Sequence, residues 1–328
     1  MTHPAHNPGH DHQAELFDGM SSHHHPDQQG DRPGGAGWSV WLTGQQQARQ
    51  QRGTRYSRLS VEHPAKMLPA IARHTIRTYT RPGDLVLDPM CGIGTTLVEA
   101  LHLGRDAIGV ELEPKWAGIA RLNLEAATTQ GALGQGQVRT GEAARTLSGL
   151  AADGSLTGRV RLVLTSPPYG SMTHGQVRSR RDGAQAVEKH AHVYSRDRDR
   201  RADNLAYQRP QVLATSFARI MAACRPLLAP GGVVVVTTRP YRKDGRLIDF
   251  PGQVAQAAQR AGLVQIDRCA ALLCAVKEGE VVSRTSFFQL IETKRLRKVG
   301  MPVHVIQHED ALVFTNPAPV AGEDRAAA

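Results

Sequence analysis

The stretch Val160-Arg161-Leu162-Val163-Leu164-Thr165-Ser166-Pro167-Pro168-Tyr169 sets the frame for the whole chain. Its apolar first half, Val160 to Leu164, is typical of a buried strand in a parallel sheet. Pro167 and Pro168 then end the strand, because neither residue has an N–H group to donate. A stiff turn therefore follows the carboxyl end of the strand, which is where open α/β sheets bind their ligands.

The same turn carries groups that can hold a planar base. The Tyr169 ring offers a stacking face, while the Ser166 hydroxyl and the Pro167 carbonyl can accept hydrogen bonds from an exocyclic amine. The alternative is that the motif is only a proline-rich turn between a strand and a loop, without a catalytic role, since four-residue motifs recur by chance. The rest of the chain has to decide between the two interpretations.

The composition predicts a cytoplasmic protein with a polyanionic partner. The chain has 328 residues, a formal charge of +10 and 40% hydrophobic residues, enough for one large domain or two small ones. Many basic proteins bind no nucleic acid, so the charge is only an indication. The four cysteines lack paired spacing, which favours neither a zinc site nor a disulfide framework and fits a reducing compartment. There is no membrane-spanning apolar run and no secretory leader pattern.

Both ends of the chain are expected to be disordered. Residues 1–55 are rich in His, Gly, Pro, Asp and Gln, and seven of them are histidines, which indicates a solvated low-complexity leader. Trp38 and Trp41 are the exception: they either dock onto the folded domain or begin it. The folded domain is predicted over residues 56–316, and residues 317–328 are expected to be frayed.

A glycine loop follows the first strand of this domain. Leu85–Asp88 predicts a short buried strand, and Asp88-Pro89-Met90-Cys91-Gly92-Ile93-Gly94-Thr95-Thr96 leads directly into a helix over 97–103 that ends at Gly104. A second strand over 107–110 ends in Glu111. This βαβ unit with a glycine loop at its first turn is typical of a nucleotide-type site.

The loop favours S-adenosylmethionine over a dinucleotide. A dinucleotide fingerprint needs a third glycine, which is missing after Gly94. Gly92 and Gly94 let the backbone approach a ligand, and Thr95 and Thr96 can hydrogen-bond with it. Glu111 stands 19 residues after Gly92 (111 − 92), close to the spacing of about 20 for an acid that binds ribose hydroxyls.

The remaining segments fit the same α/β plan. Pro64 is expected to open a helix that runs through Ile76, and residues 131–158 are expected to be rich in loops. A long amphipathic helix is predicted over 212–228, a buried strand over 233–236, a helix over 250–261 and a last strand over 308–314. Between the two halves, residues 171–210 form a basic insert without periodicity.

The insert is a candidate nucleic-acid-binding loop, because guanidinium groups pair with phosphates and the insert directly follows the turn at residue 169. A solvated loop is the alternative, since acidic residues neutralise part of its charge. The candidate residues are Arg178, Arg180, Arg181, Arg196, Arg198, Arg200 and Arg201.

Four motifs in a consistent order resemble the DNA amino-methyltransferases, which methylate cytosine N4 or adenine N6 with S-adenosylmethionine. These motifs are His63-Pro64, the glycine loop, Ser-Pro-Pro-Tyr and the closing strand that starts at His308-Glu309. The resemblance implies a class-I methyltransferase fold, a mostly parallel seven-strand sheet with helices on both faces and an antiparallel edge hairpin. It implies the catalytic residues Ser166, Pro167, Pro168 and Tyr169. It implies the cofactor-binding residues His63, Pro64, Asp88, Pro89, Met90, Gly92, Gly94, Thr95, Thr96, Glu111, Leu112, Glu142 and Ala143, with Glu142 on the adenine amine, and it implies no metal.

Serine at the first signature position favours cytosine N4 within this family, and two alternatives stay open. Met90 and Ile93 depart from the usual family loop, and Asp-Pro-Met-Cys-Gly with the later Ala120-Arg121-Leu122-Asn123 is also similar to RNA guanine-N2 methyltransferases. The other alternative is a basic nucleic-acid-binding protein with an inactive fold. The sequence does not give the recognition site, the oligomeric state or a restriction partner.

Overall fold

The computed structural model describes residues 37–169, 176–177, 189–190, 202–243, 245–285 and 287–317. Every helix and strand described below lies within the unit Trp38–Ala328. Within the described ranges, no helix combines the length and the apolar character needed to cross a membrane.

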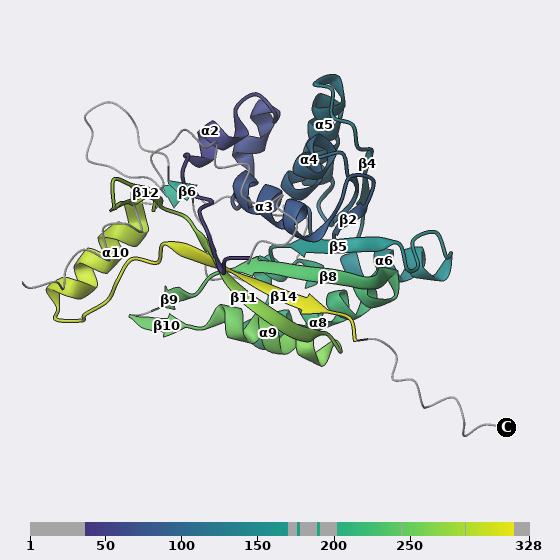
Figure 1. Ribbon diagram of the computed structural model, residues 1–328. Coiled ribbons are helices and arrows are strands. Elements are labelled where there is room, and N and C mark those ends of the chain that lie inside the picture. Colours follow the sequence, from purple (N-terminus) through teal and green to yellow (C-terminus); the bar gives the residue numbers. More distant parts are fainter. Residues whose placement is uncertain are drawn as a thin grey trace, which may run out of the picture. The chain divides into compact units, whose positions relative to one another are not determined.

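The central feature is an eight-stranded, mostly parallel sheet (Figure 1). Its strands, in spatial order, are β1 (Val40–Trp41), β11 (Val264–Leu272), β14 (His308–Thr315), β8 (Leu228–Thr238), β5 (Val160–Thr165), β2 (Leu85–Asp88), β3 (Asp106–Glu111) and β4 (Gly136–Thr140). The neighbours from β8 to β4 are parallel, and β14 is antiparallel to both β8 and β11. The predicted α/β class, with its antiparallel strands beside a parallel sheet, is confirmed.

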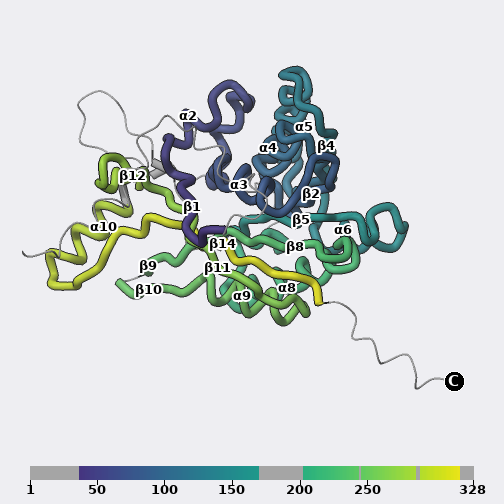
Figure 2. Tube along the Cα trace, in the orientation of Figure 1, coloured from purple at the N-terminus to yellow at the C-terminus, as the bar shows by residue number. Residues whose placement is uncertain are grey.

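The eighth strand comes from the predicted disordered leader, so the predicted domain boundary at residue 56 is wrong. Strand β1 runs parallel to β11 (Figure 2), and the nearby Thr43 hydroxyl donates to the Leu272 carbonyl at 2.7 Å. Trp41 is 3% exposed, and its ring lies 4.5 Å from the His74 ring. The low apolar content of this segment concealed the order, because backbone pairing and one buried tryptophan hold it rather than a row of apolar side chains.

Helices cover both faces of the sheet (Figure 1). One face carries α3 (Pro69–Tyr79), α4 (Thr95–His102) and α5 (Pro114–Thr129), and the other carries α6 (Ala143–Ala152), α8 (Pro210–Cys224) and α9 (Phe250–Arg260). Each face has its own core, in which Ile71 and Leu97 are fully buried on one side and Leu147 and Phe217 on the other. The sheet is therefore buried on both faces, as its continuous apolar strands require.

Two helix predictions need correction. Pro64 lies in a loop that follows the 3₁₀ helix η2 (Arg58–Glu62), and α3 begins at Pro69 instead. Both prolines suit a first helical turn, so the pattern alone could not choose between them. The region 131–158 contains α6, because Glu142 caps the backbone N–H groups of a short run of good helix formers.

Smaller elements lie beyond the carboxyl ends of the parallel strands (Figure 1). They are α2 (Ala48–Arg52), α10 (Phe287–Lys298), the 3₁₀ helix η4 (Leu205–Tyr207) and the strand pairs β6 (Gln176–Val177) with β7 (Lys189–His190), β9 (Tyr241–Lys243) with β10 (Arg246–Ile248) and β12 (Ala275–Lys277) with β13 (Glu280–Val282). A further 3₁₀ turn, η5 (Arg225–Leu227), links α8 to β8 at the other end of the sheet. The edge of the sheet where a ligand is expected is thus surrounded by added structure.

Candidate active site

A cavity of about 420 Å³ lies at the carboxyl ends of the parallel strands. Strand β2 ends in it with Asp88, strand β3 with Glu111, and β5 leads into it at Ser166. Every residue predicted to bind the cofactor or to act in catalysis lines this cavity except Gly94. Two motifs that stand more than 70 residues apart in the chain therefore share one site.

The glycine loop uses its two glycines for different purposes. Gly92 has φ +54°, and a Cβ atom at this position would lie 3.2 Å from His63 Nε2, so the loop passes close to the His63 ring. Gly94 does not line the cavity, in contrast to the prediction. It is the N-cap residue of α4, with φ +79°, and a Cβ at this position would lie 3.3 Å from the Ala120 Cβ on α5. Gly94 thus permits helix packing rather than close approach to a ligand.

Glu111 holds the glycine loop and keeps free acceptor capacity. Its Oε2 accepts a hydrogen bond from Gly92 N at 2.9 Å, and its Oε1 accepts one from Glu113 N at 2.8 Å. Burial raises the pKa of Glu111 to about 7, against the lowering effect of these two N–H groups. Each oxygen has a further lone pair, so the ionised carboxylate can accept two hydroxyl protons of a vicinal diol.

Asp88 ties together the chain segments that form the cavity. Its Oδ2 accepts from the Thr96 hydroxyl at 2.7 Å, and its Oδ1 accepts from the Thr165 hydroxyl at 2.9 Å and from Met90 N at 3.1 Å. Burial raises the pKa of Asp88 to about 6, opposed by these hydrogen bonds. The hydroxyl proton of Thr96, which we expected to serve a ligand, is therefore used within the protein.

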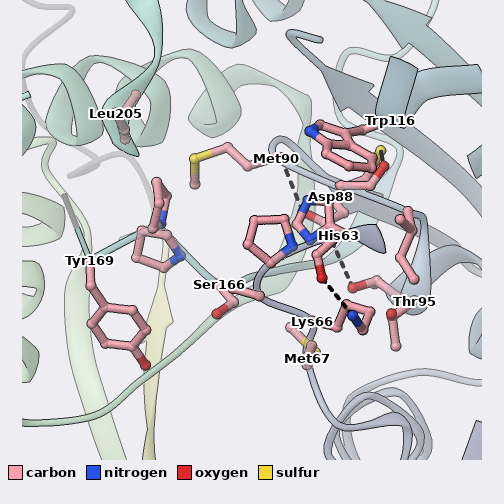
Figure 3. Close-up of a pocket in the computed structure, with 18 of the residues that line it drawn as sticks. His63, Lys66, Met67, Asp88, Met90, Thr95, Trp116, Ser166, Tyr169 and Leu205 are labelled. Carbon is pink, nitrogen blue, oxygen red and sulfur yellow. Dashed lines mark hydrogen bonds between the residues drawn. The ribbon is translucent and has the colours of Figure 1, made fainter. Parts of the chain in front are cut away.

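His63 forms an apolar wall of the cavity. Its ring is 8% exposed and packs edge-on against Trp116, with ring centroids 4.8 Å apart. Burial, together with the nearby Lys66 ammonium, lowers the pKa of His63 to about 3, so the imidazole is neutral. Lys66 Nζ donates to the His63 carbonyl at 2.6 Å (Figure 3). Trp116 also lines the cavity.

Glu142 borders the cavity as the N-cap of α6. Its two carboxylate oxygens accept hydrogen bonds from Ala144 N at 3.0 Å and from Arg145 N at 2.8 Å. A capped carboxylate is fixed in orientation, and each of its oxygens keeps a further lone pair. The predicted contact with an adenine amine stays a prediction.

The turn over residues 166–169, predicted to be catalytic, ends far from Trp116 in the cavity. Figure 3 shows Tyr169 far from Trp116 and His63, with Ser166 between them. The Tyr169 ring is already in contact with protein: its centroid lies 5.2 Å from that of Phe250, and the Arg239 guanidinium carbon lies 5.8 Å from it. Burial and the charge of Glu309 raise the pKa of Tyr169 above its usual range. Any base that stacks on Tyr169 must share the ring with these neighbours.

Several contacts at the site were not predicted from the sequence, although Asn123 and Glu309 stand in motifs quoted above. Asn123 on α5 is fully buried, donates from Nδ2 to the Ile93 carbonyl at 2.8 Å and accepts at Oδ1 from Ser57 N at 2.7 Å. A polar amide on the buried face of an amphipathic helix was the available signal. Asn204 Nδ2 donates to Glu113 Oε1 at 3.0 Å, which ties the segment before α8 to the cavity wall. Arg239 and Glu309 line the substrate end.

The predicted nucleic-acid-binding arginines lie outside the described residues, so their placement is not tested. They are Arg178, Arg180, Arg181, Arg196, Arg198, Arg200 and Arg201.

Comparison with known proteins agrees with this site. Residues 19–121 match the sequence model of the DNA methylase family. The chain is 42% identical over 65 residues to the type II methyltransferase M2.DpnII of Streptococcus pneumoniae, covering 20% of this chain and 24% of that protein. It is also 41% identical over 64 residues to the tRNA (guanine(10)-N2)-dimethyltransferase of Methanocaldococcus jannaschii, covering 19% of this chain and 18% of that protein.

Among solved structures, TrmN from Thermus thermophilus matches with a TM-score of 0.45 and 17% identity, over 81% of this chain and 53% of that chain. The aligned regions span about a quarter or less of the length of the curated relatives. The matching segment contains the glycine loop and Glu111, on which the motif resemblance also rests. The similarity to DNA methylases is therefore carried by the segment that holds the glycine loop and Glu111.

Proposed function

We propose that this chain is an S-adenosylmethionine-dependent DNA methyltransferase that methylates an exocyclic base amine, with cytosine N4 favoured over adenine N6. The observation that carries the proposal is the shared cavity: the glycine loop and Glu111 line it together with Ser166 and Tyr169, and Figure 3 shows Tyr169 far from His63 and Trp116, with Ser166 between them. A methyl donor and an acceptor amine held at these two ends would meet near Ser166.

The residues of the first end fit the cofactor. Glu111 presents two acceptor oxygens suited to ribose hydroxyls, and Glu142 presents a fixed carboxylate suited to an adenine amine. Gly92 keeps the space beside the neutral His63 ring free of a side chain. When bound, S-adenosylmethionine supplies an electrophilic methyl group on a sulfonium centre.

The residues of the second end fit an amine. The lone pair of an exocyclic amine is delocalised into its ring, which makes the nitrogen a poor nucleophile. The Ser166 hydroxyl and the Pro167 carbonyl can each accept one N–H bond of the amine, which orients the nitrogen and favours a tetrahedral geometry. The two prolines hold these acceptors in place, and positioning supplies most of the remaining acceleration. A base in a duplex must leave the stack to reach this turn.

A cationic surface near the cavity supports a nucleic-acid substrate. Helix α10 begins beside the site, where Gln289 lines the cavity, and its second half carries exposed Lys294 and Lys298. The β9–β10 hairpin packs beside α10, since a Cβ at Gly245 would lie 3.6 Å from Leu296, and it carries exposed Arg246. Such a surface can neutralise phosphates on either side of an extruded base.

The second candidate function is methylation of guanine N2 in RNA. The tRNA (guanine(10)-N2)-dimethyltransferase match supports it, at an identity close to that of the DNA enzyme. Guanine N2 is also an exocyclic amine, so the same turn can accept it.

Labelled-methyl transfer to unmethylated DNA and to RNA, followed by mass spectrometry of the nucleosides, tests both candidates. The proposal expects N4-methylcytosine in the DNA. Ser166→Ala and Tyr169→Ala should abolish transfer while calorimetry shows cofactor affinity close to wild type, and Ser148→Ala, on the exposed side of α6, should behave as wild type. Normal transfer by Ser166→Ala would refute the assignment of the turn.

A further inference from the structure

Two ionisable side chains at the substrate end have no part in the proposed cofactor site or in the catalytic turn. Glu309 stands near the start of β14 and Arg239 directly follows β8, and both line the cavity together with Ser166 and Tyr169. Glu309 Oε2 is buried and hydrogen-bonds with no residue that the structure describes. The Arg239 guanidinium lies over the Tyr169 ring.

An unsatisfied buried carboxyl group is costly, and a strand could hold an apolar residue at this position at no such cost. Burial raises the pKa of Glu309, Asp310 on the same strand raises it further, and Arg239 opposes both. Tyr169 also faces Glu309. The carboxyl group is therefore able to hold a proton in a cavity that also contains the Arg239 guanidinium.

We propose that Glu309 and Arg239 read the edge of the target base beside its reacting amine, with Glu309 on the ring nitrogen and Arg239 on the neighbouring carbonyl oxygen, so that cytosine is preferred over adenine. This inference rests on the proposed function and names the residues that set its specificity.

The order of groups on each base explains the preference. Along one edge cytosine presents the N4 amine, the N3 acceptor and the O2 acceptor. With the amine on Ser166 and the Pro167 carbonyl, a protonated Glu309 donates to N3 and Arg239 donates to O2. Adenine presents the N6 amine, the N1 acceptor and a C2–H group, which leaves Arg239 in the cavity without an acceptor.

Guanine makes the opposite demand on Glu309. Beside its N2 amine stands an N1–H donor, so Glu309 must be ionised to accept from it, while Arg239 again donates to a carbonyl. Activity on cytosine should fall as the pH rises through the pKa of Glu309, whereas activity on guanine should rise. The sign of the pH dependence therefore separates the two bases.

The test measures kcat/KM for the full-length protein on a duplex with its mapped target cytosine and on a matched duplex with adenine at that position. Arg239→Ala should lower kcat/KM on cytosine about tenfold to hundredfold and leave the adenine value nearly unchanged, so the preference collapses. Arg242→Ala, on the β9–β10 hairpin outside the cavity, is the matched control and should keep the preference. An equal loss on both duplexes would show a purely structural role and overturn the inference.

Glu309 is tested with two variants. Glu309→Ala should lose activity on cytosine about tenfold or more, and Glu309→Gln should restore most of it and remove the fall at high pH, because an amide donates at any pH. Calorimetric cofactor affinity should stay at the wild-type value in both variants. If the wild type methylates DNA and every variant keeps the wild-type preference for cytosine over adenine, only this inference is refuted. A wild-type protein that methylates neither DNA nor RNA refutes the proposed function as well, and adenine or guanine as the product overturns the preference.

Discussion

Replacing Glu111 with glutamine tests the cofactor end of the site most directly. In the folded protein both carboxylate oxygens accept backbone N–H groups, from Gly92 and Glu113. Glutamine keeps one acceptor oxygen, and its NH₂ group must face one of these two donors. The substitution therefore disturbs the glycine loop and removes half of the acceptor capacity that a ribose diol would use.

The magnitude follows from the number and type of hydrogen bonds. A hydrogen bond to a charged group contributes roughly 1.5–3 kcal/mol, and Glu111→Gln weakens two of them, so we expect a loss of about 2–4 kcal/mol. At about 1.4 kcal/mol per decade this is roughly a 30- to 1000-fold increase in the Kd of S-adenosylmethionine.

The pH dependence gives a second magnitude. With a pKa of about 7 for Glu111, the ionised fraction rises from about one tenth at pH 6 to about nine tenths at pH 8. If only the ionised form binds the diol well, the apparent Kd of the wild type falls about ninefold over this range. The Kd of Glu111→Gln should not change with pH in this way.

Isothermal titration calorimetry at pH 6, 7 and 8 measures both effects. Glu125→Gln, an exposed position on α5, is the control for loss of one carboxylate and should bind as the wild type does. A wild-type Kd that is constant from pH 6 to pH 8, or a Glu111→Gln protein that binds within twofold of wild type, would refute the role given to this carboxylate.

Three other changes have expected outcomes. Asn123→Ala should lower the free energy of unfolding by about 2–4 kcal/mol in urea denaturation, because it leaves buried partners in η2 and the glycine loop unsatisfied; a loss below about 0.5 kcal/mol would contradict this. Without ligand, the free energy of unfolding should fall as the pH rises from about 5 to 7, since the raised pKa values of Asp88 and Glu111 mean that the folded state binds more protons than the unfolded state in this range. The fall should be smaller for Glu111→Gln, and an equal fall would contradict the raised pKa of Glu111. The double variant Lys294→Glu with Lys298→Glu should weaken DNA binding and flatten its dependence on salt, and an unchanged salt slope in a filter-binding titration would exclude α10 from the interface.

The cofactor half could be predicted in detail because its contacts are local in the sequence. Strand, glycine loop and helix follow each other from Leu85 to His102, and Glu111 closes the loop from the next strand. In this segment the local strand, turn and helix preferences of the sequence agree with the fold, so the sequence pattern is enough to predict the structure. The Ser-Pro-Pro-Tyr turn is similar, since two prolines determine the backbone without help from distant residues.

The features that could not be predicted from the sequence depend on contacts between residues that are distant in the chain. Strand β1 is ordered by pairing with β11, some 230 residues later (270 − 40), and nothing in its own composition indicates this. The substrate end joins Tyr169 to Arg239 and Glu309, which follow β8 and begin β14. Arg239 is part of no local pattern, and Glu309 stands in the His308-Glu309 motif, which does not by itself place it at this site. Only the antiparallel insertion of β14 beside β8 brings Glu309 to the carboxyl end of the parallel strands.

Asp88 connects the two ends of the proposed site, because one buried carboxylate accepts hydrogen bonds from a residue beside each of them. Its Oδ2 holds Thr96 at the start of α4, behind the glycine loop, and its Oδ1 holds Thr165, the residue before Ser166. In the proposed reaction, the loop of the methyl donor and the turn of the acceptor amine are therefore both anchored on Asp88. A carboxylate accepts at both oxygens, whereas an amide at this position would accept at one only. Under the proposed function, strands β2 and β5 would align the two reacting centres through Asp88, and residues beyond these strands would select the base.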